Sequence, residues 1–132
     1  MKGQEELLFA DLCSRIPYGV RVKFTEFSSL KDKGLIGINA YDNDIPIVTC
    51  RTENGIITMP LRYVKPYLYP LSSMTEEQKM FLRQQNWCIA ISTSGTIETT
   101  IEGIDWLNKN HFDYRGLIPM GLANDATNLN IY

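Results

Sequence analysis

The sequence contains no apolar run that approaches the about 20 residues a membrane-spanning helix needs. It holds one histidine and three cysteines, and no Cys-x-x-Cys or close Cys/His pair provides the chelating corner of a zinc site. Cys13, Cys50 and Cys88 are odd in number and far apart, which is unlike a disulfide framework. We therefore expect three reduced thiols, buried or half-buried, with no metal and no cofactor.

Strong charge of one sign is also lacking. The 132 residues carry a net charge of −2, so no whole-chain attraction to nucleic acid or to an anionic membrane is expected. The N-terminal stretch "MKGQEELLFADLCSRIP" lacks the basic leader and apolar region of a secretion signal. We expect a cytoplasmic protein with no membrane partner.

Sequence motifs of common enzymes are missing as well. The chain has no Gly-x-Ser-x-Gly, no Walker loop and no His-Glu-x-x-His. The acidic stretch at residues 42–44 lacks the further oxygen ligands of a calcium loop and is interpreted as a turn. An enzymatic function is therefore left open, and a non-enzymatic protein is expected.

Two helices are predicted from apolar spacing and caps. Residues 5–16 place Leu8, Leu12 and Ile16 on one stripe, and Pro17 ends the helix. Residues 75–85 begin with Thr75 and Gln78, which have the spacing of a capping box.

Residues 20–68 have the pattern of β-structure. Short alternating segments are separated by turn residues, including the hairpin signal Asn54-Gly55. A glycine inside the segment "LIGINAY" predicts a bulge or a sharp bend, and Pro60 predicts an edge strand or a bulge. Such segments predict a small, strongly bent antiparallel sheet or an SH3-like barrel, and a plain meander covered by a helix fits equally well.

The remainder completes an α+β fold in a single domain, residues 1–132. "KPYLYP" is interpreted as an extended connector because two prolines bracket it. A hairpin and short helices are expected over residues 87–123, the last of them capped by Asp113, followed by a loosely held polar tail, residues 124–132.

Three blocks of the chain carry a resemblance: "DLCSRIPYGV", "VKPYLYPLSSMTEE" and "IDWLNKNHFDYRGLIPMGLA". They resemble the recurring blocks of a family of small uncharacterised proteins encoded in genomes of gut Bacteroidales and in their prophages and phages. The resemblance covers about half of the chain. It implies a cytoplasmic protein of bacterial or phage origin, and it carries over no ligand and no catalytic residue.

A catalytic site is the sharpest hypothesis for the only histidine. His111 has the side chain of a general base, and Asp113, Tyr114 and Arg115 follow it closely. The alternative is a structural joint, in which Asp113 caps a helix, Arg115 pairs with an acid and the aromatic residues pack. The joint is favoured, because no nucleophile motif accompanies the histidine.

Nucleic-acid binding is a second hypothesis, based on the β zone. Cationic and tyrosine side chains interleave there, as in single-strand binding proteins, although the positive surplus is small. The candidate residues are Arg21, Lys23, Arg62, Tyr63, Lys65 and Tyr67.

Binding to another protein is the default hypothesis, because no catalytic set is assembled. The chain would then be an accessory or adaptor protein of a prophage or mobile element. A homo-oligomer is an alternative, with Trp87 or Trp106 as interface anchors, although core packing is favoured for both.

Overall fold

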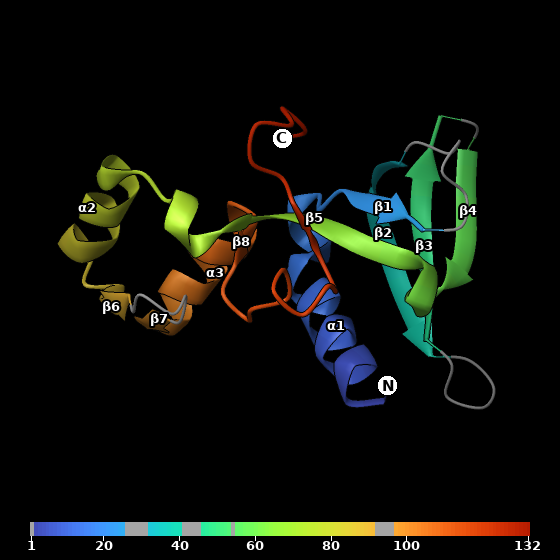
Figure 1. Cartoon of the computed structure of the whole chain (residues 1–132), viewed down its shortest axis with the longest axis horizontal. Coiled ribbons are helices and arrows are strands. Elements are labelled where there is room, and N and C mark those ends of the chain that lie inside the picture. Colours follow the sequence, from blue (N-terminus) through green and yellow to red (C-terminus); the bar gives the residue numbers. More distant parts are fainter. Residues whose placement is uncertain (1, 26–31, 41–45, 54, 92–96) are drawn as a thin grey trace.

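The computed structural model describes residues 2–25, 32–40, 46–53, 55–91 and 97–132 (Figure 1). It confirms an α+β fold that combines α-helices with short strands in small sheets. The helices are α1 (Lys2–Arg15), α2 (Glu76–Gln84) and α3 (Ile101–Lys109). Within the described ranges, none of them is long and apolar enough to cross a membrane. The residues interpreted as a turn at 42–44 lie outside the described part of the chain.

Helix α1 covers the larger hydrophobic core. Its apolar stripe buries Leu8 and Leu12 against the strands, and partly buried Ile16 continues the stripe at the end of the helix. A short 3-10 helix (Ile16–Tyr18) carries Pro17, and Gly19 then reverses the chain with a φ of 70°. The predicted helix is confirmed, and it begins three residues earlier than expected.

The three-stranded sheet is antiparallel, in the order β2 (Asp32–Ala40), β3 (Pro46–Thr52) and β4 (Gly55–Pro60). Its register shifts between Leu35 and Gly37, as predicted from the glycine there, and also between Asp32 and Gly34, which was not predicted. The hairpin between β3 and β4 is confirmed, and Pro60 ends the outer strand, where a missing N–H is tolerated.

Strand β5 (Val64–Pro70) corrects the prediction of a connector, since "KPYLYP" is the spine of a second sheet (Figure 1). It pairs antiparallel with β1 (Val22–Phe24) and parallel with β8 (Phe112–Asp113) and β9 (Asn124–Asp125). The Tyr67 amide donates a hydrogen bond to Arg21 O, and the Tyr69 amide donates one to His111 O. Pro66 and Pro70 occupy the alternate positions of the strand. The N–H groups that they lack would therefore face the opposite edge of β5 from the Tyr67 and Tyr69 amides.

The described strands do not close into an SH3-like barrel. They form separate small sheets, and the β5 sheet is mixed because its C-terminal partners run parallel to it. The bent antiparallel sheet of the prediction corresponds to β2–β4. The parallel partners come from the far end of the chain, which local patterning does not reveal.

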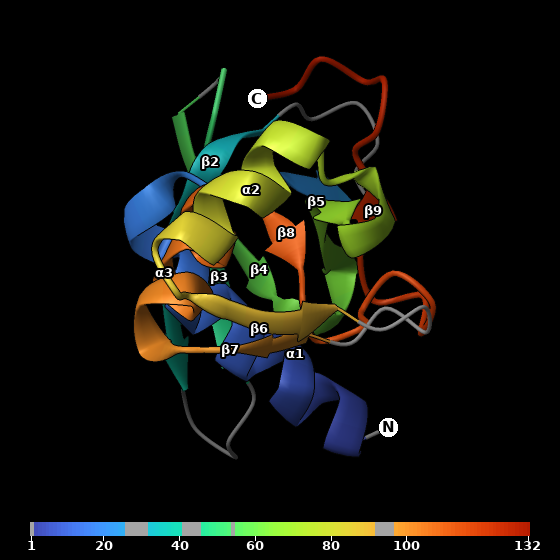
Figure 2. The ribbon, with the colours of Figure 1, turned by 90° about the vertical axis from the view of Figure 1, so that its left-hand side faces the viewer.

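A second, smaller core lies at the other end of β5, where α2, α3 and the hairpin of β6 (Cys88–Ile91) and β7 (Ile97–Thr99) meet (Figure 2). The predicted capping box is confirmed: Gln78 N donates to Thr75 Oγ1, and Thr75 N donates to the Gln78 side chain. This core buries the side chains of Leu71, Met74, Leu82, Leu107 and Phe112.

The prediction of a helical C-terminal block is wrong beyond α3. Residues 111–123 form strand β8 and turns, because Gly116 and Gly121 adopt positive φ and Pro119 cannot donate. The tail is also held more firmly than predicted. Ala126 is fully buried and its N–H donates to Leu68 O. The tail therefore supplies a partner for β5, which its polar composition did not indicate.

Candidate functional site

Asp113 ends strand β8 and caps the turn that follows it. Its two carboxylate oxygens accept hydrogen bonds from Leu117 N and Ile118 N, both at 2.9 Å. The cap was predicted, although it closes a turn and not a helix. Among the described residues, no hydrogen bond joins this carboxylate to the His111 imidazole, whose buried Nδ1 has no partner.

Arg115 pairs with an acid, as the structural joint predicted, and the acid is Asp11 on α1. Arg115 Nε lies 3.2 Å from Asp11 Oδ1, at ion-pair distance but without hydrogen-bond alignment. Asp11 also accepts from Arg15 Nε at 2.8 Å and Nη2 at 3.1 Å. One buried carboxylate therefore neutralises part of the charge of two guanidinium groups.

Tyr114 contacts both of these guanidinium groups. The Arg15 and Arg115 carbons Cζ are 5.2 and 5.1 Å from the centre of its ring, within the range of cation–π attraction. Phe112 packs elsewhere, stacked on Trp106 with a centroid distance of 5.7 Å. The aromatic residues pack as expected, on different partners and not on each other.

His111 is held by the tail and by an uncommon backbone conformation. Its φ is 64°, and its carbonyl accepts a hydrogen bond from Tyr69 N. Its ring stacks on the Tyr132 ring with a centroid distance of 3.6 Å. Burial and the nearby charge of Arg15 lower the pKa of His111 to about 4. The histidine is therefore neutral at pH 7 and stacked, while Asp113 and Arg115 are committed to other partners.

Four of the six nucleic-acid candidates, Arg21, Lys23, Lys65 and Tyr67, lie on one face of the β1–β5 ladder, whereas Tyr63 is partly buried against the larger core. Lys23 lies opposite Lys65 in register, and continuing that register places Arg21 opposite Tyr67. The alternate residues point into the core, so these side chains share the outer face. Arg62 precedes the strand and stacks on Tyr63 with its Cζ 4.8 Å from the ring centre.

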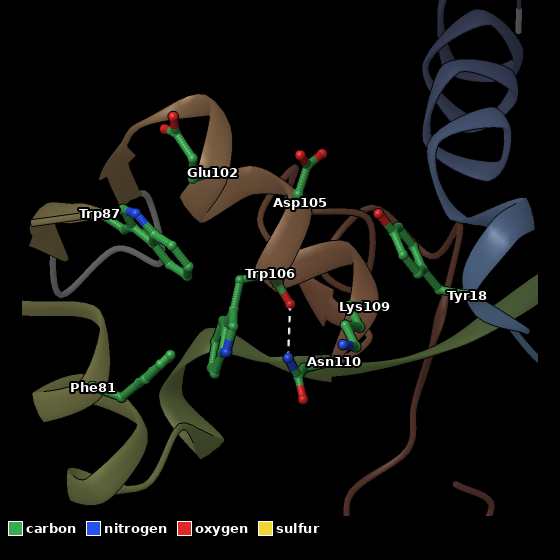
Figure 3. Close-up of a pocket in the computed structure, with 8 residues that line it drawn as sticks. All are labelled: Tyr18, Phe81, Trp87, Glu102, Asp105, Trp106, Lys109 and Asn110. Carbon is green, nitrogen blue, oxygen red and sulfur yellow. Dashed lines mark hydrogen bonds between the residues drawn. The ribbon is translucent and has the colours of Figure 1, made fainter. Parts of the chain in front are cut away.

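A cleft of about 580 Å³ lies between α2, α3 and the 3-10 helix after α1, and we refer to it as the tryptophan cleft (Figure 3). Such a volume is within the range of small-ligand and peptide side-chain sites. Both tryptophans of the chain line it, and each is only half-buried. The lining residues are Tyr18, Phe81, Trp87, Glu102, Asp105, Trp106, Lys109 and Asn110.

Helix α3 supplies one wall of the tryptophan cleft. Glu102, Asp105, Trp106 and Lys109 recur at helical spacing and so share a face. Gly103 lets this helix approach the strand region closely, because a Cβ there would lie 2.8 Å from Trp87 O. A larger residue would push the two walls of the cleft apart.

Aromatic contacts fix the other walls. Phe81 meets Trp87 edge-on at a centroid distance of 5.7 Å and lies 6.2 Å from Trp106. Trp106 is backed in turn by buried Phe112. The rings are thereby held in place before any ligand binds, which lowers the entropic cost of binding.

A second cleft of about 520 Å³ adjoins the first, since Lys109 and Asn110 line both. Its walls include Tyr69, His111 and Tyr132.

The cysteines provide no alternative site. Cys50 is buried and Cys88 half-buried, but Cys13 is exposed, which corrects the expectation for that thiol. Partial burial raises the pKa of Cys13 and of Cys88, so both thiols are less readily ionised than a free one. Among the described residues, no three His, Cys, Asp or Glu side chains gather closely enough to hold a metal ion.

Comparison with known proteins adds no assignment: no protein-family model, curated protein or solved structure matches this chain. The site is therefore judged on its geometry. The sequence favoured core packing for Trp87 and Trp106, with interface anchoring as the alternative, and both are partly buried against the smaller core. It did not join them to Phe81, Tyr18 or the acids of α3. The helical spacing from Glu102 to Lys109 was the available signal.

Proposed function

We propose that this chain is a non-enzymatic binding protein that holds a segment of another protein in the tryptophan cleft. The observation that carries the proposal is the presence of both tryptophans, half-exposed, around one preformed hollow. Tryptophan is enriched among the residues that dominate protein–protein binding energy. The commitment of Asp113 and Arg115 to structural contacts supports a non-enzymatic role.

The biological setting is part of the same proposal. A small protein with a peptide-sized cleft, whose described residues assemble no catalytic set, suits an accessory or adaptor role in a prophage or related mobile element, in the cytoplasm. Recognition of a linear segment needs only the rigid aromatic walls described above, which a short α+β chain can supply.

Selection from a library of random peptides tests this function. The purified protein should enrich peptides whose affinity falls at least about tenfold in Trp87→Ala, because a central tryptophan contributes about 2 kcal/mol or more to an interface. Met120→Ala, which removes an exposed side chain that does not line the cleft, should bind them like wild type. Circular dichroism checks that each variant folds.

Two results would contradict the proposal. One is a selection in which no peptide distinguishes wild type from Trp87→Ala. The other is a concentration-dependent dimer in analytical ultracentrifugation that Trp87→Ala abolishes, because a second copy would then occupy the cleft.

We propose nucleic-acid binding as the second candidate, favoured by the Lys23–Lys65 register on the outer face of β1 and β5. A labelled single-stranded oligonucleotide should then bind at low salt, and its fluorescence anisotropy should fall as salt rises. The double variant Lys23→Gln/Lys65→Gln should weaken binding and flatten that salt dependence. Absence of binding at low salt would remove this candidate.

A further inference from the structure

We infer that the segment held in the tryptophan cleft presents an arginine side chain, which lies against the indole rings and pairs with the carboxylates of α3. This inference rests on the proposed function and specifies its ligand. It arises from one juxtaposition: Glu102 and Asp105 line the same hollow as Trp87 and Trp106, and the residues are labelled in Figure 3.

The acids of α3 are available to a ligand. Glu102 and Asp105 are exposed, are one helical turn apart, and take part in none of the ion pairs found among the described residues. The cleft also contains one cation, Lys109, which lies beside Asn110 (Figure 3). Two carboxylates against one ammonium leave the lining negative, so a cationic group is favoured over an anion.

The aromatic rings favour the same kind of ligand. Cations are attracted to the face of an aromatic ring, and tryptophan gives the strongest attraction. Carboxylates next to such a ring add an ion pair that is partly shielded from water. A neutral apolar side chain would gain from the rings alone and would leave Glu102 and Asp105 beside an apolar surface.

Guanidinium fits this combination better than ammonium. It is planar, it is less strongly hydrated, it stacks on rings, and it can pair with a carboxylate through two parallel hydrogen bonds. Among the described residues, a guanidinium group lies over a tyrosine ring three times: Arg15 and Arg115 on Tyr114, and Arg62 on Tyr63.

The size of the cleft indicates an arginine within a peptide and not a free cation. A volume of about 580 Å³ exceeds what one side chain fills, so neighbouring residues of the same segment enter as well. The apolar groups of the segment then contact Phe81 and Tyr18, and its guanidinium pairs with the carboxylates of α3.

The test uses four pools of heptapeptides with randomised flanks, each with one fixed central residue: arginine, lysine, citrulline or glutamine. Citrulline keeps the shape of arginine without its charge. We expect the arginine pool to bind wild type about three- to tenfold more tightly than the citrulline pool, as one cation–π contact and one exposed ion pair allow. The lysine pool should lie between them.

A charge-neutral variant locates the effect. Glu102→Gln/Asp105→Asn should remove the preference for arginine over citrulline, while the matched control Glu5→Gln/Glu6→Gln, which removes two exposed acids of α1, should keep it. Intrinsic fluorescence gives a second readout, because the only two tryptophans both line the cleft. The arginine pool should shift or quench that emission.

The outcomes separate this inference from the proposed function. Equal binding of the arginine and citrulline pools, lost in Trp87→Ala, would overturn the arginine and keep the peptide-binding cleft. Equal loss of the preference in the α1 control would show that net charge, and not the cleft, selects the cation. If no pool binds wild type more tightly than Trp87→Ala, both proposals fail.

Discussion

Replacing Asp11 by asparagine is expected to lower the free energy of unfolding by about 3–5 kcal/mol, the cost of breaking a buried ion pair from one side. Asp11 and Arg15 are both fully buried, and Arg115 shares the same carboxylate. The variant leaves a buried guanidinium without its counter-ion. Urea unfolding followed by circular dichroism measures the loss.

Two further variants show that the effect comes from the buried charge. Glu6→Gln removes an exposed acid from the same helix and should change stability by less than about 0.5 kcal/mol. The double variant Asp11→Leu/Arg15→Met removes both buried charges and should unfold less easily than Asp11→Asn alone. A loss below about 1 kcal/mol in Asp11→Asn would mean that water already solvates the pair.

The same network positions a wall of the tryptophan cleft. Arg15 Nη2 donates to Phe112 O at 2.6 Å, and the Phe112 ring stacks on Trp106. Helix α1 is thus connected through a buried arginine to β8, and through β8 to the cleft. The stretch that suggested a catalytic site therefore makes the contacts of a structural joint and supports Trp106, which lines the tryptophan cleft.

Local signals predicted the elements that local physics determines. The capping box of Thr75 and Gln78 depends on residues three apart, and the β3–β4 hairpin depends on its turn, so both were readable. The apolar stripe of α1 has the same character, because its spacing alone identifies the buried face.

The errors lie where distant segments decide the structure. Two prolines made β5 look like a connector, yet the strand pairs with residues 22–24, 112–113 and 124–125. The Tyr67 and Tyr69 amides donate hydrogen bonds to these neighbouring segments, so the missing N–H groups of the prolines do not interrupt them. Two-residue strands carry no periodic pattern. The turns after Asp113 likewise depend on positive φ at Gly116 and Gly121, which sequence spacing does not reveal.

Stability should also fall as pH drops from about 6.5 to 4, because His111 resists protonation in the folded chain. Its pKa is lowered to about 4 by burial and by Arg15, whereas in the unfolded chain it has its ordinary value near 6.5. Between these values the unfolded state binds the proton and the folded state does not. The stability contribution is therefore complete above 6.5 and is lost through this window.

A difference measurement isolates that contribution. His111→Asn removes the titrating group and suits the positive φ of 64° that asparagine tolerates. At pH 7 the variant should be less stable than wild type, since the stacking on Tyr132 is lost. As pH falls to 4 the gap should shrink by about 1–3 kcal/mol, less than the full pKa difference implies because the imidazole keeps some contact with water. Carboxylates elsewhere titrate equally in both proteins and cancel, so a constant gap would show that the folded histidine protonates normally.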